Sequence, residues 1–189
     1  KKARDESKKI NRPYVSPYND IHVIAGQGTI GVEVESQCDN LDTIIISVGG
    51  GGLIGGIGAY LKSVLPQINI IGCSPENSAV MIHSIQAGKI LDMESKPTLS
   101  DGTAGGVEEN SITFPICKDV IDKLVMVNES EIQQAMVNFI KYEHSLIEGA
   151  AGTAIAALSK LKNELKSSKV AVVICGGNIS INNLRKILH

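Results

Sequence analysis

The sequence lacks the features of membrane proteins and of nucleic-acid-binding proteins. No apolar run reaches the roughly 18 residues that a transmembrane helix needs. The formal net charge is -2, whereas binding to a phosphate backbone favours a basic surface. With 43% hydrophobic and 20% charged residues, the 189-residue chain is typical of a globular protein of about one domain. We therefore expect neither a membrane nor a nucleic acid as its partner.

The sequence also lacks clusters of cysteine or histidine. Its four cysteines lie far apart, without the C-x-x-C spacing of zinc or redox sites, at Cys38, Cys73, Cys117 and Cys175. The four histidines are equally scattered. These patterns predict no metal site, and the unpaired cysteines favour a cytoplasmic location, where thiols stay reduced.

The most informative stretch is a run of four glycines between two apolar segments. Residues 43–48 are apolar and mostly β-branched, which predicts a buried strand, and residues 53–65 resume with helical spacing. Four residues without a Cβ let a ligand approach several backbone N–H groups at once, and the helix dipole adds about half a positive charge there. The geometry predicts a phosphate-binding turn.

The rest of the chain alternates between strand and helix patterns. Further strands are expected at residues 14–15, 68–73, 123–127 and 170–175. Helices are expected at residues 1–10, 23–37, 78–87, 129–140, 151–161 and 180–188, and residues 90–114 show no period. This alternation predicts an α/β fold with a mostly parallel sheet, helices on both faces and ligands at the carboxyl ends of the strands. Two such ends contain glycines, at residues 49–52 and 176–177, so we expect them to face one crevice.

The glycine run also fits a different cofactor. Gly50-Gly51-Gly52-Leu53-Ile54-Gly55 matches the dinucleotide pattern G-x-G-x-x-G, and Glu76 follows the second strand of that unit, where an acidic residue would bind a ribose. An NAD-dependent oxidoreductase is therefore one alternative. A phosphate-loop nucleotidase is disfavoured, because no Gly-Lys-Ser or Gly-Lys-Thr follows the glycines.

Several motifs taken in order are more specific than any one of them. They are Tyr14-Val15-Ser16-Pro17-Tyr18-Asn19-Asp20, Ile24-Ala25-Gly26-Gln27-Gly28-Thr29-Ile30-Gly31, the four glycines, Leu99-Ser100-Asp101-Gly102 and Cys175-Gly176-Gly177-Asn178. With these motifs the chain resembles the serine/threonine dehydratase (threonine ammonia-lyase) family from Tyr14 to Asn178. These are pyridoxal-phosphate enzymes of the tryptophan-synthase-β fold (fold type II), related to serine racemase.

The resemblance implies a set of cofactor-binding residues. Those of the phosphate cup are Gly49, Gly50, Gly51, Gly52 and Leu53. Cys175 matches the position that faces the pyridine nitrogen, Gly102 a loop glycine beside the ring, and Glu148 an acid of the same pocket. A neutral thiol leaves that nitrogen largely unprotonated, which favours β-elimination. The alternatives are a buried strand-end cysteine for Cys175 and a carboxylate near a helix start for Glu148.

The resemblance also implies an activity for the parent enzyme and a catalytic lysine that this chain lacks. The parent enzyme would convert L-serine or L-threonine by β-elimination into a 2-oxo acid and ammonia, as a homodimer or larger homo-oligomer. The family's Schiff-base lysine lies in a Ser-x-Lys-x-Arg-Gly motif that does not occur here, so we expect no catalytic residue in this chain. Ser74 and Val80 stand where several members have acidic cation ligands, which argues against a divalent site.

The N-terminal end suggests how the chain is divided. The chain has no signal peptide and begins at Lys1 instead of Met, so we expect it to be the C-terminal portion of a longer enzyme. Residues 1–13 would end a preceding small domain or form a linker helix, and residues 14–189 would belong to the large cofactor-binding domain. A non-catalytic truncated paralogue or partner subunit is the alternative. From the cup alone, we expect Gly50→Val or Gly51→Val to weaken cofactor binding far more than folding.

Overall fold

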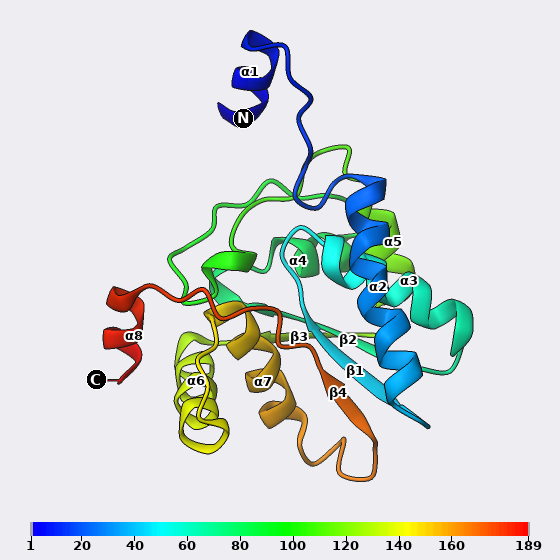
Figure 1. Cartoon of the computed structure of the whole chain (residues 1–189), viewed down its shortest axis with the longest axis vertical. Coiled ribbons are helices and arrows are strands. Elements are labelled where there is room, and N and C mark those ends of the chain that lie inside the picture. Colours follow the sequence, from blue (N-terminus) through cyan, green and yellow to red (C-terminus); the bar gives the residue numbers. More distant parts are fainter. Residues whose placement is uncertain (1, 189) are drawn as a thin grey trace.

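The computed structural model describes residues 2–188, which form a parallel four-stranded sheet between two layers of helices (Figure 1). The strand order is β3-β2-β1-β4. The strands are β1 (Thr43–Ser47), β2 (Asn69–Pro75), β3 (Lys123–Val127) and β4 (Val170–Val172). In the register, Ile45 of β1 lies opposite Ile71 of β2 on one side and Val172 of β4 on the other. The predicted α/β fold with a parallel sheet is confirmed.

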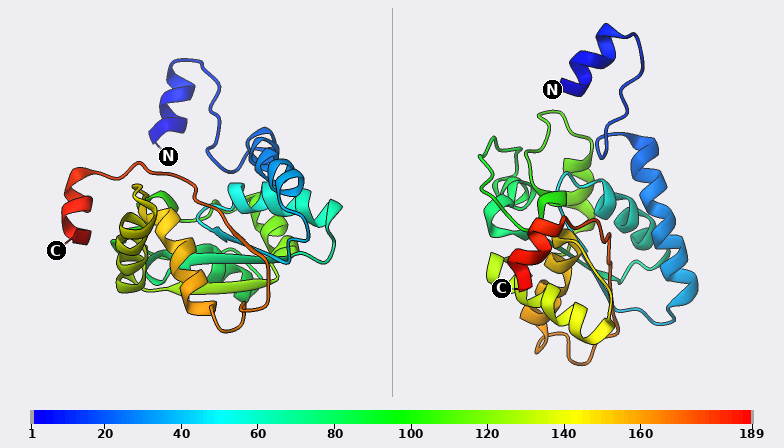
Figure 2. Two further views of the ribbon diagram at one scale, coloured as in Figure 1. Left: turned by 60° about the horizontal axis from the view of Figure 1, so that its bottom comes forward. Right: turned by 60° about the vertical axis from the view of Figure 1, so that its left-hand side comes forward.

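Helices cover both faces of the sheet, as the sequence pattern predicts (Figure 2). One layer contains α2 (Ile21–Gln37), α3 (Gly52–Val64), α4 (Val80–Ala87) and α5 (Thr113–Val120). The other contains α6 (Glu129–Glu143), α7 (Gly149–Leu161) and α8 (Ile181–Leu188). The short helix α1 (Lys2–Lys9) stands apart from both layers in the views of Figures 1 and 2. Within residues 2–188, none of the helices combines the length and the apolarity that crossing a bilayer requires.

The core has two halves because successive side chains of a strand point to opposite faces of the sheet. Ile44 and Ile46 pack with α3 and α5, whereas Ile45 packs with α6 and α7. All three isoleucines are fully buried. This explains the unbroken apolar run of the central strand, since both of its faces are covered.

Local sequence signals set the ends of several helices. The N-cap of α2 is Asp20, whose carboxylate accepts hydrogen bonds from the N–H groups of His22 and Val23. The start of α6 carries the capping box that Asn128 and Glu131 predict. A left-handed glycine, Gly88, ends α4.

Three elements differ from the sequence-based expectation. Residues 14–15 form no strand and lie in an exposed loop, because no neighbouring strand pairs with them. The last strand ends at Val172 instead of Cys175 and is only half-buried, because β4 is at the edge of the sheet. Helix α5 was not expected from its short, mixed sequence; its Pro115 is tolerated because it lies in the first turn, where N–H groups have no intrahelical partner.

Candidate functional site

A cavity of about 390 Å³ opens at the carboxyl ends of β1 and β4. This size is within the range of small-molecule sites, about 300 to 1,000 Å³. The cavity is lined by every residue that the sequence analysis singled out for cofactor binding: Gly49, Gly50, Gly51, Gly52, Leu53, Gly102, Glu148 and Cys175. The segments that follow β1 and β4 do meet at one crevice, because the two strands are neighbours in the sheet, but Cys175 lines the cavity and Gly176 and Gly177 do not.

The glycine turn, residues 49–52, presents a row of free backbone donors. Within residues 2–188, the N–H groups from Gly49 to Ile54 have no hydrogen-bond partner. The carbonyl groups are held from α5, where the Thr113 hydroxyl donates to the Gly50 oxygen (2.6 Å) and the Cys117 thiol to the Gly51 oxygen (3.5 Å). Free donors at the start of α3 add to the positive end of its dipole. The arrangement suits a phosphate group.

The glycines are also required by the protein's own packing. A Cβ on Gly50 would lie 2.4 Å from the ring of Tyr18, and a Cβ on Gly51 would lie 2.6 Å from the Cys117 sulfur. Gly51 further has a φ of 89°, in the left-handed region. Gly51→Val should therefore destabilise the fold as well as weaken cofactor binding, because the collision and the left-handed backbone conformation both raise the energy of the folded state.

Cys175 lies between a hydroxyl and a carboxylate. Its sulfur is 3.6 Å from the Ser47 hydroxyl and 3.9 Å from Oε1 of Glu148. Desolvation in the cavity raises the pKa of Cys175, and the adjacent Glu148 carboxylate raises it further, against the opposing effect of the Ser47 hydrogen bond. The side chain is therefore a neutral thiol near pH 7.

Glu148 is held in place by the backbone that follows Cys175. Its N–H donates to the Gly176 oxygen (3.0 Å), and its Oε2 accepts from the N–H of Asn178 (3.2 Å). A Cβ on Gly176 would lie 2.6 Å from the carboxyl carbon, so a side chain at this position would displace the Glu148 carboxylate. Glu148 precedes α7 without capping it through its side chain, so its position at a helix start does not by itself explain its contacts.

Some lining residues were missed by the sequence analysis. Tyr18, Ser47 and Thr103 line the cavity together with the predicted residues. Ser47 could have been found as the last residue of β1, directly before the turn. The fold brings Tyr18 and Thr103 to the cavity from segments outside the strand ends. Tyr18 belongs to the motif of residues 14–20, but that motif gave no reason to place its side chain at the site.

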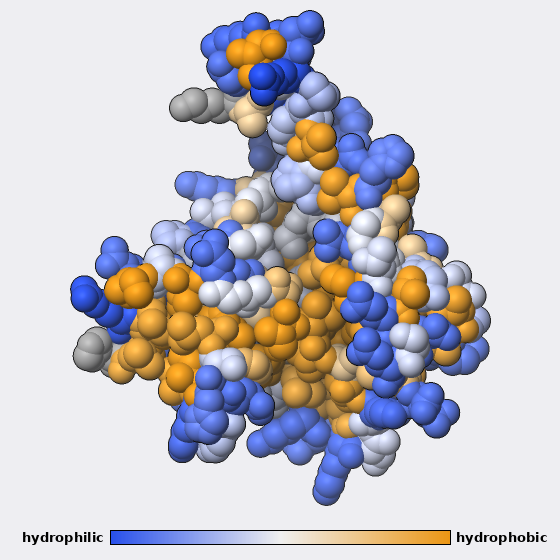
Figure 3. All heavy atoms as spheres, in the orientation of Figure 1, coloured by the Kyte–Doolittle hydropathy of each residue, from blue (hydrophilic) through white to orange (hydrophobic). Residues whose placement is uncertain are grey.

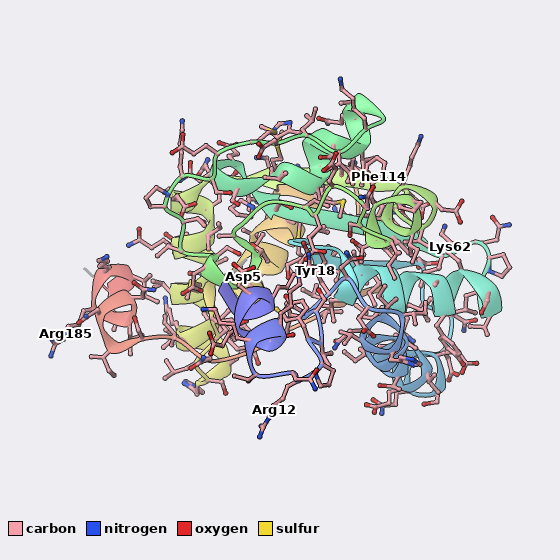
Figure 4. The ribbon with its side chains drawn as sticks, turned by 90° about the horizontal axis from the view of Figure 1, so that it is seen from above. Asp5, Arg12, Tyr18, Lys62, Phe114 and Arg185 are labelled. Atoms are coloured by element: carbon pink, nitrogen blue, oxygen red, sulfur yellow. The ribbon has the colours of Figure 1, made fainter. Side chains whose placement is uncertain are left out.

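The residues expected for the alternative, NAD-binding site do not come together at the cavity. Glu76 is exposed at the start of the 3₁₀ turn Glu76–Ser78 and is not among the residues that line the cavity. No lysine in the described part of the chain lines the cavity either. Viewed from above, Lys62 lies at the outer end of α3, while Tyr18 lies near its start (Figure 4).

The fold and the cavity define an α/β protein with a glycine-lined ligand site at the carboxyl ends of parallel strands. The chain belongs to the family of pyridoxal-phosphate dependent enzymes, whose model matches residues 1–176. This family assignment agrees with the resemblance that the motifs carry, and it makes pyridoxal phosphate the cofactor.

Proteins with similar sequences are named as threonine ammonia-lyases or threonine dehydratases. The chain is 41% identical over 182 residues to an L-threonine ammonia-lyase of Thermotoga maritima, covering 96% of this chain and 45% of that protein. It is 38% identical over 178 residues to the catabolic L-threonine dehydratase TdcB of Escherichia coli, covering 93% of this chain and 54% of that protein. The chain thus spans about half the length of these relatives.

Solved structures share the fold. The processed form of threonine deaminase isoform 2 from Solanum lycopersicum matches with a TM-score of 0.91 and 30% identity, over 97% of this chain and 54% of that one. Serine racemase from Dictyostelium discoideum matches with a TM-score of 0.84 and 33% identity, over 95% of this chain and 58% of that one.

The site's own geometry fits a phosphorylated cofactor of this kind. The free N–H groups from Gly49 to Ile54 can donate hydrogen bonds to a phosphate. A Cβ at any position of the glycine turn would collide with the side chains or backbone packed against that turn. The neutral thiol of Cys175 lies across the same cavity, at the end of the adjacent strand. One bound molecule can therefore contact both.

Proposed function

We propose that this chain supplies the cofactor-binding part of a pyridoxal-phosphate-dependent ammonia-lyase that acts on L-serine or L-threonine. The observation that carries the proposal is one cavity that combines free N–H donors at residues 49–54 with the neutral thiol of Cys175. The names of the relatives, L-threonine ammonia-lyase and L-threonine dehydratase, support the choice of substrate class.

Each residue of the cavity has a distinct part in this proposal. The glycine turn binds the phosphate through its N–H groups, and Leu53 continues that row of donors at the start of α3. Cys175, a neutral and weak partner, leaves the pyridine nitrogen unprotonated. Glu148 stands beside Cys175 and Gly102 and shapes the wall around the ring. When bound, pyridoxal phosphate supplies the electron sink that a β-elimination needs.

The catalytic base of the proposed reaction is not supplied by this chain. No lysine of residues 2–188 lines the cavity, and the family's lysine motif does not occur in the sequence. We infer that the base that removes the α-proton comes from another polypeptide segment and that this chain alone is inactive in β-elimination. Residues 14–189 would be the large cofactor-binding domain, and residues 1–13 the end of a small domain or a linker. Its setting would be cytoplasmic, in a homodimer or larger homo-oligomer.

The proposal is tested by ligand binding and by product formation. Pyridoxamine 5'-phosphate is the better probe, because it has no aldehyde to react with surface lysines. We expect it to bind the chain in a ³¹P NMR titration and NADH not to bind. With L-threonine and pyridoxal phosphate, the chain alone should release no 2-oxo acid. Binding of NADH without binding of pyridoxamine 5'-phosphate would contradict the cofactor, and turnover by the chain alone would contradict the missing base.

A second candidate is a non-catalytic partner subunit, favoured by the open edge of the sheet. On its outer side β4 has no pairing strand among the described residues, and apolar side chains at Leu146, Ile174 and Ile181 are 52%, 41% and 65% exposed. Figure 3 shows hydrophobic surface gathered over α7, β4 and α8. The intact mass of the natural protein separates the candidates. A mass near 20.0 kDa would favour the partner subunit, and a larger mass the enzyme.

A further inference from the structure

Among residues 2–188, Tyr18 is the one aromatic side chain that lines the cavity, and it packs directly on the glycine turn. The Cβ that Gly50 lacks would lie 2.4 to 2.6 Å from three ring atoms of Tyr18. The Cβ that Gly52 lacks would lie 2.9 Å from the Tyr18 Cα. The ring therefore occupies the space beside the turn, where Gly50 and Gly52 let it approach the backbone.

The segment around Tyr18 also holds a second wall of the cavity, the loop of residues 104–112. The hydroxyl of Tyr18 accepts a hydrogen bond from the N–H of Glu108 (3.2 Å). Beside it, Asn19 accepts from the N–H of Ile112 (2.9 Å) and donates to the Glu108 carboxylate (2.6 Å). Loop 104–112 is thus tied to the Tyr18 segment at two backbone positions.

The glycine turn and loop 104–112, which both contact the Tyr18 segment, line the same cavity. Gly105 and Gly106, from the same loop, line it together with Tyr18 and the glycine turn. Seen from above, Tyr18 lies near the start of α3, whereas Arg12 points away from the body (Figure 4). Partial burial raises the pKa of Tyr18, so the phenol is neutral near pH 7 and puts no negative charge beside an anion.

We propose that Tyr18 is a positioning residue for the cofactor phosphate: its ring forms the outer wall of the glycine turn, and its hydroxyl holds loop 104–112 against that wall. The inference rests on the cofactor site of the proposed function. It assigns a role to an uncharged residue that the sequence places in the motif of residues 14–20 without a function of its own.

The test compares two ligands that differ only in the phosphate, pyridoxamine 5'-phosphate and pyridoxamine. In Tyr18→Ala, we expect the affinity of the full chain for the phosphorylated ligand to fall by about tenfold, the scale of lost contacts to a charged group. The affinity for pyridoxamine should change by less than about twofold, because pyridoxamine lacks the phosphate that the glycine turn beside Tyr18 would bind. Tyr142→Ala, at an exposed tyrosine of α6, is the matched control and should change neither affinity.

Tyr18→Phe separates the ring from the hydroxyl. It should retain most of the affinity for pyridoxamine 5'-phosphate while hydrogen exchange at the Glu108 N–H becomes faster, since that N–H loses its partner. If Tyr18→Ala does not fold, Tyr18→Phe decides alone. Unchanged exchange and unchanged affinity would then overturn the proposal.

The outcomes distinguish this inference from the proposed function. If the wild-type chain binds the phosphorylated ligand and Tyr18→Ala, correctly folded, prefers it over pyridoxamine as strongly as the wild type does, only the role of Tyr18 is overturned. If the wild-type chain does not bind the phosphorylated ligand, the cofactor site and the role of Tyr18 are both overturned.

Discussion

At the scale of single residues, two glycines share a left-handed backbone conformation but differ in the space available for a side chain. Gly51 and Gly88 both adopt a left-handed conformation, with φ of 89° and 71°. Around Gly51, however, the space for a Cβ is filled by the sulfur of Cys117 and the methyl end of Met81, whereas nothing lies within 4 Å of a Cβ on Gly88. The two positions therefore separate backbone strain from collision.

We predict that Gly51→Ala lowers the free energy of unfolding by about 2 to 4 kcal/mol, because left-handed strain of about 1 kcal/mol adds to overpacking. Gly88→Ala should cost only about 1 kcal/mol, from strain alone. Urea denaturation of both variants measures the difference. Equal losses would show that the collision at Gly51 relaxes without cost.

The charge of Glu148 should be readable at the neighbouring Cys175. Desolvation raises the pKa of Cys175, and the Glu148 carboxylate adds to that shift. We predict that Glu148→Gln lowers the pKa of Cys175, so that more thiolate is present at pH 8 and alkylation by iodoacetamide becomes about two- to threefold faster. Mass spectrometry resolves the sites, with Cys38 as the internal control. An unchanged or slower reaction at Cys175 would contradict the electrostatic coupling.

At the scale of elements, β4 is an edge strand, which pairs with β1 on one side and, within the described chain, has an open backbone edge on the other. The Lys169 oxygen and the Val173 N–H both bond to β1, so by alternation the backbone groups of Ala171 also face β1. Those of Val172 point to the open edge. The edge position also explains why β4 is half-buried although its sequence is as apolar as that of β1.

We predict that Ala171→Pro lowers the free energy of unfolding by about 3 kcal/mol, because it removes a ladder hydrogen bond and distorts the strand. Val172→Pro should cost about 1 kcal/mol, since edge positions tolerate proline. Chemical denaturation of the two variants provides the comparison. A larger loss for Val172→Pro than for Ala171→Pro would mean that the outer edge of β4 is paired.

At the scale of the whole molecule, α1 is joined to the body by few contacts. Arg4 forms an ion pair with Glu108 (2.5 Å), the residue whose N–H binds Tyr18. Partial burial acts to raise the pKa of Glu108, but hydrogen bonds from Asn19 and Arg4 outweigh it and lower the pKa. The carboxylate therefore stays ionised below the usual pH for a glutamate, and the ion pair is lost only as the pH falls through this lowered pKa.

We predict that Glu108→Gln, at neutral pH, makes trypsin cleavage after Lys9 several times faster, because the segment before Tyr14 loses its charged anchor. Glu109→Gln is the matched control, since the adjacent Glu109 is exposed and forms no ion pair in the described structure. The cleavage rate is followed by mass spectrometry. The same rate in both variants would mean that α1 is held by other contacts.

Local patterns in the sequence determined the fold class and the position of the glycine turn. The apolar run of β1, the capping box of Asn128 and the left-handed Gly88 depend on neighbours within a few residues, so their structures follow from short-range steric and hydrogen-bonding rules. The glycine turn could be named from its position between a strand and a helix, whereas Gly102, Glu148 and Cys175 were expected at the site only because of the resemblance to the family.

Only the tertiary structure decided which segments meet. The edge position of β4 follows from strand order, which depends on contacts between residues far apart in the chain. The same holds for Tyr18 over Gly50, whose sequence separation leaves no periodic trace. The sequence by itself therefore located the glycine turn, whereas the packing of distant segments decided what encloses it, because enclosure is a property of nonlocal contacts.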